Sequence, residues 1–188
     1  ESRANAVVAK VGADGKVCFY TFGGATHLIA DVAGYFPGGS QFTSLTPTRL
    51  LDTREGGTGA PAAGATTPLV VGGTPSVPAN AEAVVLNLTA VDTAGPGYVT
   101  AFPAGGSEPN ASNVNFTKAG EIVPNLVVVK LGDGGAVSLF SGVSSSHLLA
   151  DVVGYFPEGA DYEPLVPARL LDTRADGETV DGEGRGAG

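Results

Sequence analysis

The stretch His147-Leu-Leu-Ala-Asp-Val-Val-Gly-Tyr-Phe-Pro157 decides the fold, because it occurs twice. The earlier copy, His27-Leu-Ile-Ala-Asp-Val-Ala-Gly-Tyr-Phe-Pro37, lies 120 positions upstream and differs at two residues. After a nine-residue connector each copy leads to a second motif, Pro47-Thr-Arg-Leu-Leu-Asp-Thr-Arg54 or Pro167-Ala-Arg-Leu-Leu-Asp-Thr-Arg174. Self-similarity at a fixed offset is the signature of an internal repeat.

The repeat extends over most of the chain. Residues 1–68 align with residues 121–188 without a gap and with 28 identities in 68 pairs, whereas 69–120 has no counterpart. The unit is therefore about 120 residues long, which is the size of a domain and far longer than a propeller blade or solenoid coil. Because residue 1 falls within a unit, we expect the chain to be a window of a longer polypeptide.

The prolines that end each copy mark the expected boundaries. The sequence predicts the C-terminal part of a first unit at 1–37, a complete unit at 47–157 and the N-terminal part of a following unit at 167–188. The connectors 38–46 and 158–166 each carry an aromatic residue and a leucine, which a flexible Gly/Ser tether would lack. We therefore expect both connectors to pack on the units that they join.

Composition favours an all-β protein. The chain has 29 Gly and 13 Pro but no Met or Trp, and its apolar residues form short runs, as expected for strands joined by Gly/Pro turns. Turn signals at roughly 8–12-residue intervals predict an antiparallel two-sheet sandwich of Greek-key or jelly-roll type, with a closed barrel as the alternative. Eight strands are expected, at 48–54, 67–71, 81–91, 98–102, 111–117, 122–131, 137–141 and 147–156.

Each copy also contains two β-rich runs around a Gly/Asp turn, at Gly12–Gly15 and at Gly132–Gly135. This arrangement predicts a β-hairpin in each copy.

Polar residues that recur at the unit boundaries are the candidates for a site. A histidine precedes an aspartate by four residues in each copy, but in a strand such residues lie roughly 13 Å apart, too far to share a metal ion. Asp52 and Arg54 would lie on one strand face roughly 7 Å apart, so each is expected to bond a neighbouring strand or loop. Asp52 could help to bind a sugar or Ca²⁺, whereas the structural alternative is a partly buried ion pair or an Asx-type turn.

No EF-hand spacing, nucleophile elbow or phosphate-cradling loop is present in the sequence. We therefore predict neither an enzyme nor a cofactor or metal site, and interpret the recurring residues as a structural junction between consecutive units. The junction candidates are His27, Asp31, Tyr35, Asp52, Arg54, His147, Asp151, Tyr155, Asp172 and Arg174.

The charge and the hydropathy of the chain limit the kinds of partner that it can bind. The net charge is −9 and the ten Lys and Arg residues are scattered, which argues against nucleic-acid binding. No apolar run approaches the roughly 20 residues needed to span a bilayer. We expect the partners to be neighbouring copies of the same repeat, in one chain or in head-to-tail subunits, with surface glycans as a second candidate.

Six motifs follow one another along the chain: Arg-Leu-Leu-Asp-Thr-Arg, then residues 77–89, Gly97-Tyr-Val-Thr, residues 109–115, Val123-Pro-Asn-Leu-Val-Val and Asp151-Val-Val-Gly-Tyr-Phe. This order resembles repeats of secreted proteins from actinobacteria and related bacteria, and the resemblance covers essentially the whole chain. It implies tandem extracellular β modules of long cell-surface proteins, with no catalytic residues to carry over. The expected function is a structural module of a stalk, fibre or filament, with an adhesin or carbohydrate-binding module as the alternative.

The resemblance also bears on Cys18. Many such repeats pair the cysteine of a Gly-Lys-Val-Cys strand with one in a Tyr-Pro-Cys segment of the same unit. Cys18 fills the first place and the second would lie before residue 1, while the complete unit has Ser138 and Ala104 at the two places. We expect Cys18 to be unpaired or bridged to upstream sequence.

Overall fold

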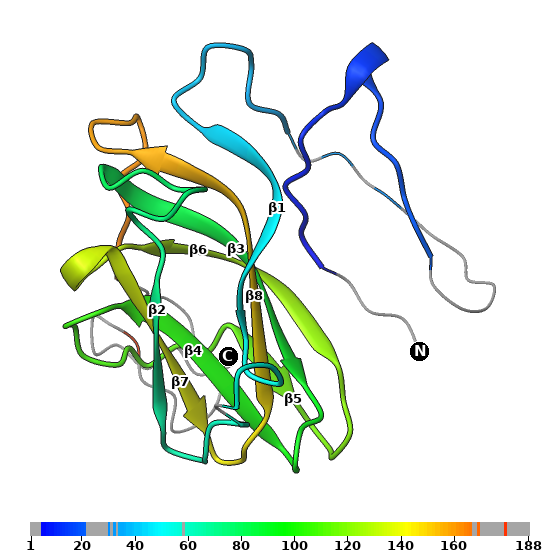
Figure 1. The fold of residues 1–188 in the computed structure, drawn as a ribbon, viewed down its shortest axis with the longest axis vertical. Helices are drawn as coiled ribbons and strands as arrows, with labels where there is room; N and C mark the ends of the chain where they lie inside the picture. The colour runs from blue at the N-terminus through cyan, green and yellow to red at the C-terminus, as the bar shows by residue number, and fades with distance from the viewer. Residues whose placement is uncertain are drawn as a thin grey trace, which may run out of the picture.

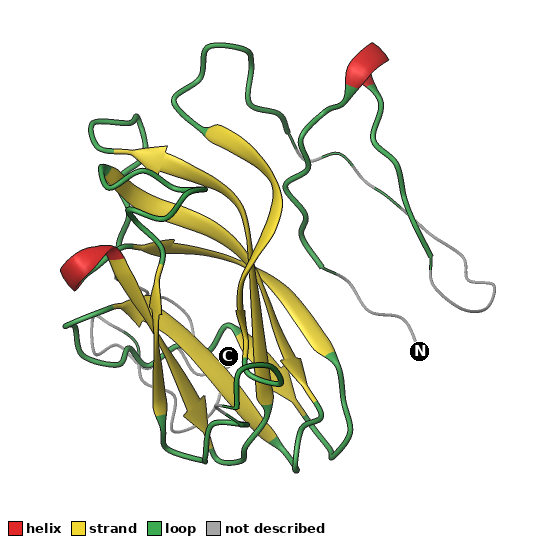
Figure 2. Ribbon diagram, in the orientation of Figure 1, coloured by secondary structure: helices red, strands yellow, loops and turns green. Residues whose placement is uncertain are grey.

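The computed structural model describes residues 5–21, 30, 32, 34–57, 59–166, 169 and 179. Strands dominate these residues, and the helical part consists of two single 3₁₀ turns (Figure 2). The strands are β1 (Thr43–Asp52), β2 (Thr66–Val70), β3 (Ala81–Val91), β4 (Gly97–Pro103), β5 (Val114–Phe116), β6 (Val123–Lys130), β7 (Ala136–Gly142) and β8 (His147–Pro157). The 3₁₀ turns are η1 (Ala13–Gly15) and η2 (Asp133–Gly135).

The strands form two four-stranded antiparallel sheets (Figure 1). Sheet A has the order β1-β8-β3-β6 and sheet B the order β2-β7-β4-β5. Neighbours within each sheet are antiparallel throughout. The predicted fold class, an all-β protein with two antiparallel sheets in a sandwich, is confirmed at this level.

The hydrophobic core lies between the two sheets. Alternate residues of β3, among them Leu86 and Leu88, point inward and are fully buried against Val99 of β4 and Leu139 of β7. Each such side chain contributes about 1.5–3 kcal/mol through the removal of apolar surface from water. Alternate residues of each strand point inward, so the apolar residues at these positions stabilise the sandwich through their burial.

The predicted hairpin around Gly132–Gly135 is wrong, although both of its strands form. β6 pairs with β3 in sheet A, whereas β7 pairs with β2 and β4 in sheet B. The turn η2 carries the chain across the sandwich edge, and its Asp133 N–H donates to the carbonyl of Ala104 (2.9 Å). A Cβ at Gly132 would overlap the Ala104 backbone, so glycine permits this close approach.

The strand predicted at 48–54 starts earlier, at Thr43. Thr43 and Ser44 pair with Tyr155 and Gly154 of β8, so the second half of the predicted connector 38–46 belongs to β1. The segment begins with the glycine-rich residues 38–40, so the sequence predicted a connector where the structure has the start of a strand.

Residues 5–21, the N-terminal arm, lie beside the sandwich on the side of β1 (Figure 1). The arm turns at η1, and none of its residues is assigned to a strand, so the hairpin expected there is not formed in the described residues. Over the described part of the chain, no helix has the length and apolar character needed to cross a bilayer.

Candidate functional site at the β1–β8 edge

Four charged side chains form a network where β1 meets β8. Arg49 and Asp151 are register partners, and the guanidinium binds the carboxylate through both Nε and Nη2 (Nη2 to Oδ2, 3.2 Å). Arg49 also donates from Nη1 to Oδ2 of Asp52 (2.9 Å). Such bidentate pairs are among the stronger hydrogen bonds in proteins. Arg49 therefore links the end of β1 to the middle of β8.

Asp52 and Arg54 bond each other, contrary to the expectation that each would bond a neighbouring strand or loop, and they form the ion pair and Asx-type turn of the structural alternative. Nε and Nη2 of Arg54 lie 2.9 and 2.6 Å from the two carboxylate oxygens of Asp52, and the Arg54 backbone N–H donates to Oδ1 (3.1 Å). The strand spacing does not apply because β1 ends at Asp52 and the chain turns, with the Glu55 N–H donating to the Asp52 carbonyl (3.1 Å). The result is an Asx-type turn closed by an ion pair.

The network shifts the protonation equilibria of its members. The side-chain hydrogen bonds from Arg54 hold the pKa of Asp52 well below its usual range, and the backbone N–H of Arg54 and the charge of Arg49 act in the same direction against desolvation. The hydrogen bond to Asp151 raises the pKa of Arg49, and the hydrogen bond to Asp52 raises the pKa of Arg54. Asp52, Arg49 and Arg54 are thus held in their charged forms at neutral pH.

Thr53 fastens the same end of β1 to β8. Its hydroxyl lies 3.0 Å from Nδ1 of His147 and accepts the N–H of Leu148 (2.9 Å), while its own N–H donates to the Leu148 carbonyl (3.1 Å). Thr53 is almost fully buried. The first residues of β8 are therefore held by a turn that follows β1, and His147 belongs to this contact.

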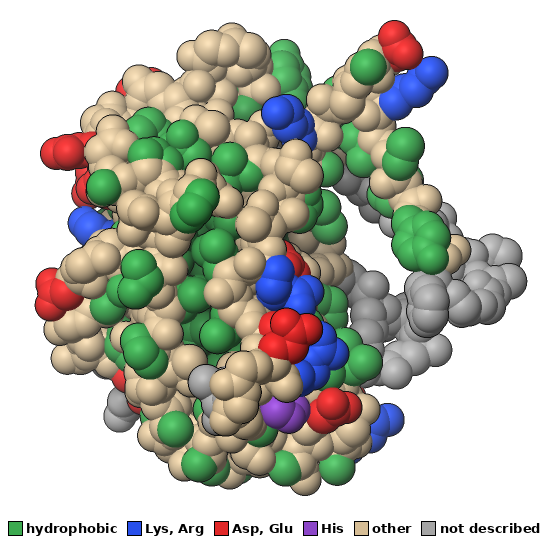
Figure 3. Space-filling model, viewed as in Figure 1, with side chains coloured by type: hydrophobic (Ala, Val, Ile, Leu, Met, Phe, Trp, Pro, Cys, Tyr) green, Lys and Arg blue, Asp and Glu red, His purple; other side chains and the backbone are tan. Residues whose placement is uncertain are grey.

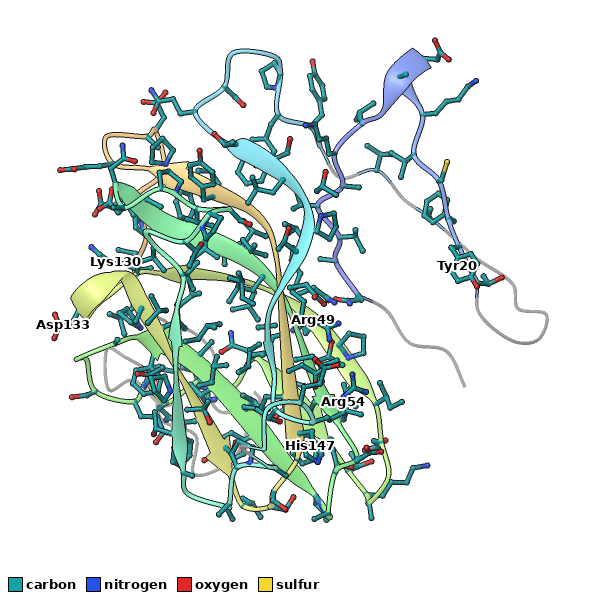
Figure 4. The ribbon with its side chains drawn as sticks, in the orientation of Figure 1. Tyr20, Arg49, Arg54, Lys130, Asp133 and His147 are labelled. Atoms are coloured by element: carbon teal, nitrogen blue, oxygen red, sulfur yellow. The ribbon has the colours of Figure 1, made fainter. Side chains whose placement is uncertain are left out.

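Figure 3 shows these side chains as a patch of alternating basic and acidic groups beside a histidine. In Figure 4, Arg49, Arg54 and His147 lie along β1 and the neighbouring end of β8. The carboxylates of Asp52 and Asp151 are both engaged by guanidinium groups, so they offer neither a general base nor a free metal ligand. Within the described residues, no three His, Cys, Asp or Glu side chains are grouped to hold a metal ion.

An aromatic cluster joins the segment before β1 to the segment after β8. Phe36 stacks on Phe42 before β1, with ring centroids 4.4 Å apart, and Phe156 stacks on Tyr162 after β8, at 4.3 Å. Phe42 and Phe156 link the two stacks at 5.0 Å, and burial raises the pKa of the Tyr162 hydroxyl. The two stacks occupy equivalent positions of the repeat, 120 residues apart. The chain thus enters and leaves the sandwich at one aromatic corner.

The structure brings together four of the ten junction candidates, Asp52, Arg54, His147 and Asp151. Tyr35 is exposed and Tyr155 packs on the main core, so these two do not join the network. The candidates His27, Asp31, Asp172 and Arg174 lie outside the described residues.

Arg49 and Thr53 of this edge were not singled out from the sequence. A usable signal existed for both, because Arg169 and Thr173 stand at the equivalent positions of the next copy. Comparisons of the chain with protein-family models, curated proteins and solved structures found no match.

Proposed function

We propose that this chain is a segment of a secreted bacterial surface protein built from tandem β-sandwich units, and that its role is structural. Residues 47–157 are one unit, and the segments on either side belong to its neighbours. The extracellular location rests on the resemblance of the sequence motifs. The observation that supports the tandem arrangement is the solvent exposure of the apolar side chains in the N-terminal arm.

These side chains are exposed where their counterparts in the complete unit are buried. Val7 is 76% exposed and Phe19 68%, whereas the equivalent Val127 and Leu139 are 2% and 0% exposed. Apolar residues in strand-like runs are normally covered. The arm therefore has the side chains of β6 and β7 without the remaining strands that would bury them.

The residues that follow the unit support the same reading. Leu165 is 76% exposed, whereas the equivalent Leu45 packs against the core from β1. Exposed apolar residues on both sides of a well-packed sandwich are what partial neighbouring units would present.

The turn of the arm reproduces the turn of the unit. In η1 the Gly12 N–H donates to the Lys16 carbonyl, and in η2 the Gly132 N–H donates to the Ala136 carbonyl, both at 2.9 Å. The backbone at Asp14 (φ 61°, ψ 21°) matches that at Gly134 (φ 65°, ψ 19°). Two segments 120 residues apart therefore share a backbone conformation that few residues adopt.

The strand order supports a finer assignment of the fold. Two sheets with the orders β1-β8-β3-β6 and β2-β7-β4-β5 pair the first strand with the last and the second with the seventh. This nested pairing is that of an eight-stranded jelly roll, which we infer to be the type of sandwich in each unit.

The same interpretation accounts for the exposed tyrosines without a sugar-binding platform. Tyr20 and Tyr35 lie outside the sandwich, at 85% and 86% exposure, and Figure 4 places Tyr20 on the arm away from the sheets. Their counterparts Phe140 and Tyr155 are partly buried within the unit. Their exposure therefore follows from the missing part of their own unit.

The test is the size and shape of the native protein with its flanking sequence. We expect a denatured mass well above the 18.6 kDa of these residues and a particle with a repeating density in negative-stain electron microscopy. The denatured mass separates one long chain from assembled short subunits. A compact particle without a repeat would refute the proposal.

A further inference from the structure

The outer face of sheet A is apolar at its centre. In β3 the inward residues alternate with Ala83 and Val85, which point to the other face and are also buried. Together with Phe42 and with Val153 and Phe156 of β8 they form a hydrophobic cluster that is separate from the core and is called the outer cluster below. The outer face of a sandwich sheet is normally polar where water covers it. This face is therefore built to be covered.

The N-terminal arm lies on this face. Val8 packs on the outer cluster, and the side-chain Oδ1 of Asn5 accepts the backbone N–H of Leu126 (3.1 Å). Leu126 belongs to β6, an edge strand of sheet A, and no strand of the described residues pairs with its outer edge. Covering such an edge also removes a site of unwanted strand pairing.

The side of the arm that faces sheet A corresponds to the outward-facing side of β6 in the complete unit. Val8 is the equivalent of Val128, which points outward from the complete unit and is 40% exposed there. Val7, the equivalent of the core residue Val127, is 76% exposed in the arm and does not belong to the outer cluster. Successive residues of an extended chain point to opposite sides. The arm thus turns toward the sandwich the side that a whole preceding unit would present, and keeps its core side free.

The arm alone covers the face incompletely. A cavity of about 750 Å³ remains between residues 5–12 and 16–18 of the arm and a wall formed by β1, β8, β3 and β6. Asn87, Asp151 and Val153 are part of this wall. An arm of one chain thickness leaves a space that a complete neighbour with its own side chains would fill.

We propose that the outer face of sheet A is the docking surface for the preceding copy of the repeat unit, which packs on it through its own β6 segment. This inference rests on the proposed tandem function and adds the surface by which consecutive units contact each other. The contact combines the apolar outer cluster with the hydrogen bond between the Asn5 side chain and the β6 edge. The adjacent aromatic corner, through Phe36 and Phe42, fixes where the two units join.

A pair of neighbouring substitutions tests the docking surface in the chain of 188 residues. Val8→Glu places a charge against the outer cluster, and Val7→Glu is the matched control, because Val7 is 76% exposed and does not belong to that cluster. Both lie outside the sandwich and leave its thermal unfolding unchanged. We expect Val8→Glu to accelerate proteolysis within residues 5–12 about tenfold and to speed amide exchange of Leu126, while Val7→Glu matches the unmodified chain.

Equal behaviour of the two variants, in either direction, would overturn the docking surface. The outcome is independent of the test of the proposed function. A native particle with a clear repeat and no difference between the variants would leave tandem units that dock elsewhere. A native particle without a repeat would refute the tandem function itself, whatever the arm does in this chain.

Discussion

Replacing Phe42 with alanine measures how firmly the connector before β1 is held on the sandwich. The ring is 9% exposed and lies between Phe36 and Phe156. Removing a buried phenylalanine side chain costs about 3 kcal/mol at the lower end of the usual range, which suits a satellite cluster. At about 4 °C per kcal/mol for a domain of this size, the melting temperature should fall by roughly 12 °C.

A double-mutant cycle with Gly154 makes this prediction specific. A Cβ at Gly154 would overlap the Phe42 ring, so Gly154→Ala alone should destabilise the sandwich by about 1–3 kcal/mol through overpacking. In the Phe42→Ala background the ring is absent and only the Thr43 carbonyl, 2.9 Å from the same position, still crowds it. The double variant should therefore be more stable than the sum of the two single effects by about 1 kcal/mol or more.

The assay is urea unfolding of the 188-residue chain followed by far-ultraviolet circular dichroism, with unchanged m values as the condition for comparison. Phe36→Ala serves as the control, because this ring is half exposed and its loss should cost about 1 kcal/mol. Additivity of the two substitutions within about 0.5 kcal/mol would refute the packing of Phe42 on Gly154.

Three further outcomes are expected. Thr53→Val should destabilise the chain by about 1–3 kcal/mol in urea unfolding, because the Leu148 N–H loses its hydroxyl acceptor, whereas Thr53→Ser should restore most of the loss. Asp52 has its folded pKa below the unfolded value of about 3.9, so its stabilising contribution is complete above that pH and is lost as the pH falls further. Asp52→Asn should therefore flatten the decline of stability below about pH 4, and an unchanged acid slope would contradict the pairing with Arg54. Cys18, which is exposed and free, should react completely with a thiol reagent under native conditions, and protection in the protein with its flanking sequence would indicate an upstream disulfide.

The strands could be predicted from the sequence because the patterns that indicate a strand lie within a few neighbouring residues. Alternating apolar residues and Gly/Pro turns located eight strands, and β3 was predicted with its observed bounds, Ala81–Val91. The pairing around Gly132–Gly135 could not be predicted in this way. Two consecutive strands show the same alternation whether they pair side by side or face each other across a core. Here the distinction depends on the contact of η2 with Ala104, which is distant in sequence.

The candidate site was predicted in part for a similar reason. Asp52 and Arg54 were recognised by their repeated motif, but their mutual ion pair depends on the end of β1 at Asp52, and strand ends are poorly defined by sequence. Arg49 and Asp151 are 102 residues apart in the chain, and only the register of β1 on β8 brings them together. Contacts of this kind are fixed by tertiary pairing.

The shared corner of the two connectors determines how the unit responds to tension. A force applied through residues 36–42 and 157–162 acts on the start of β1 and the end of β8, where Thr43 pairs with Tyr155. These antiparallel neighbours would be pulled apart from one end, so their ladder hydrogen bonds break in succession. In the tandem array proposed above, we expect each unit to lengthen at low force by unzipping β1 from β8 after the Phe42–Phe156 contact yields, while β3 to β7 stay folded.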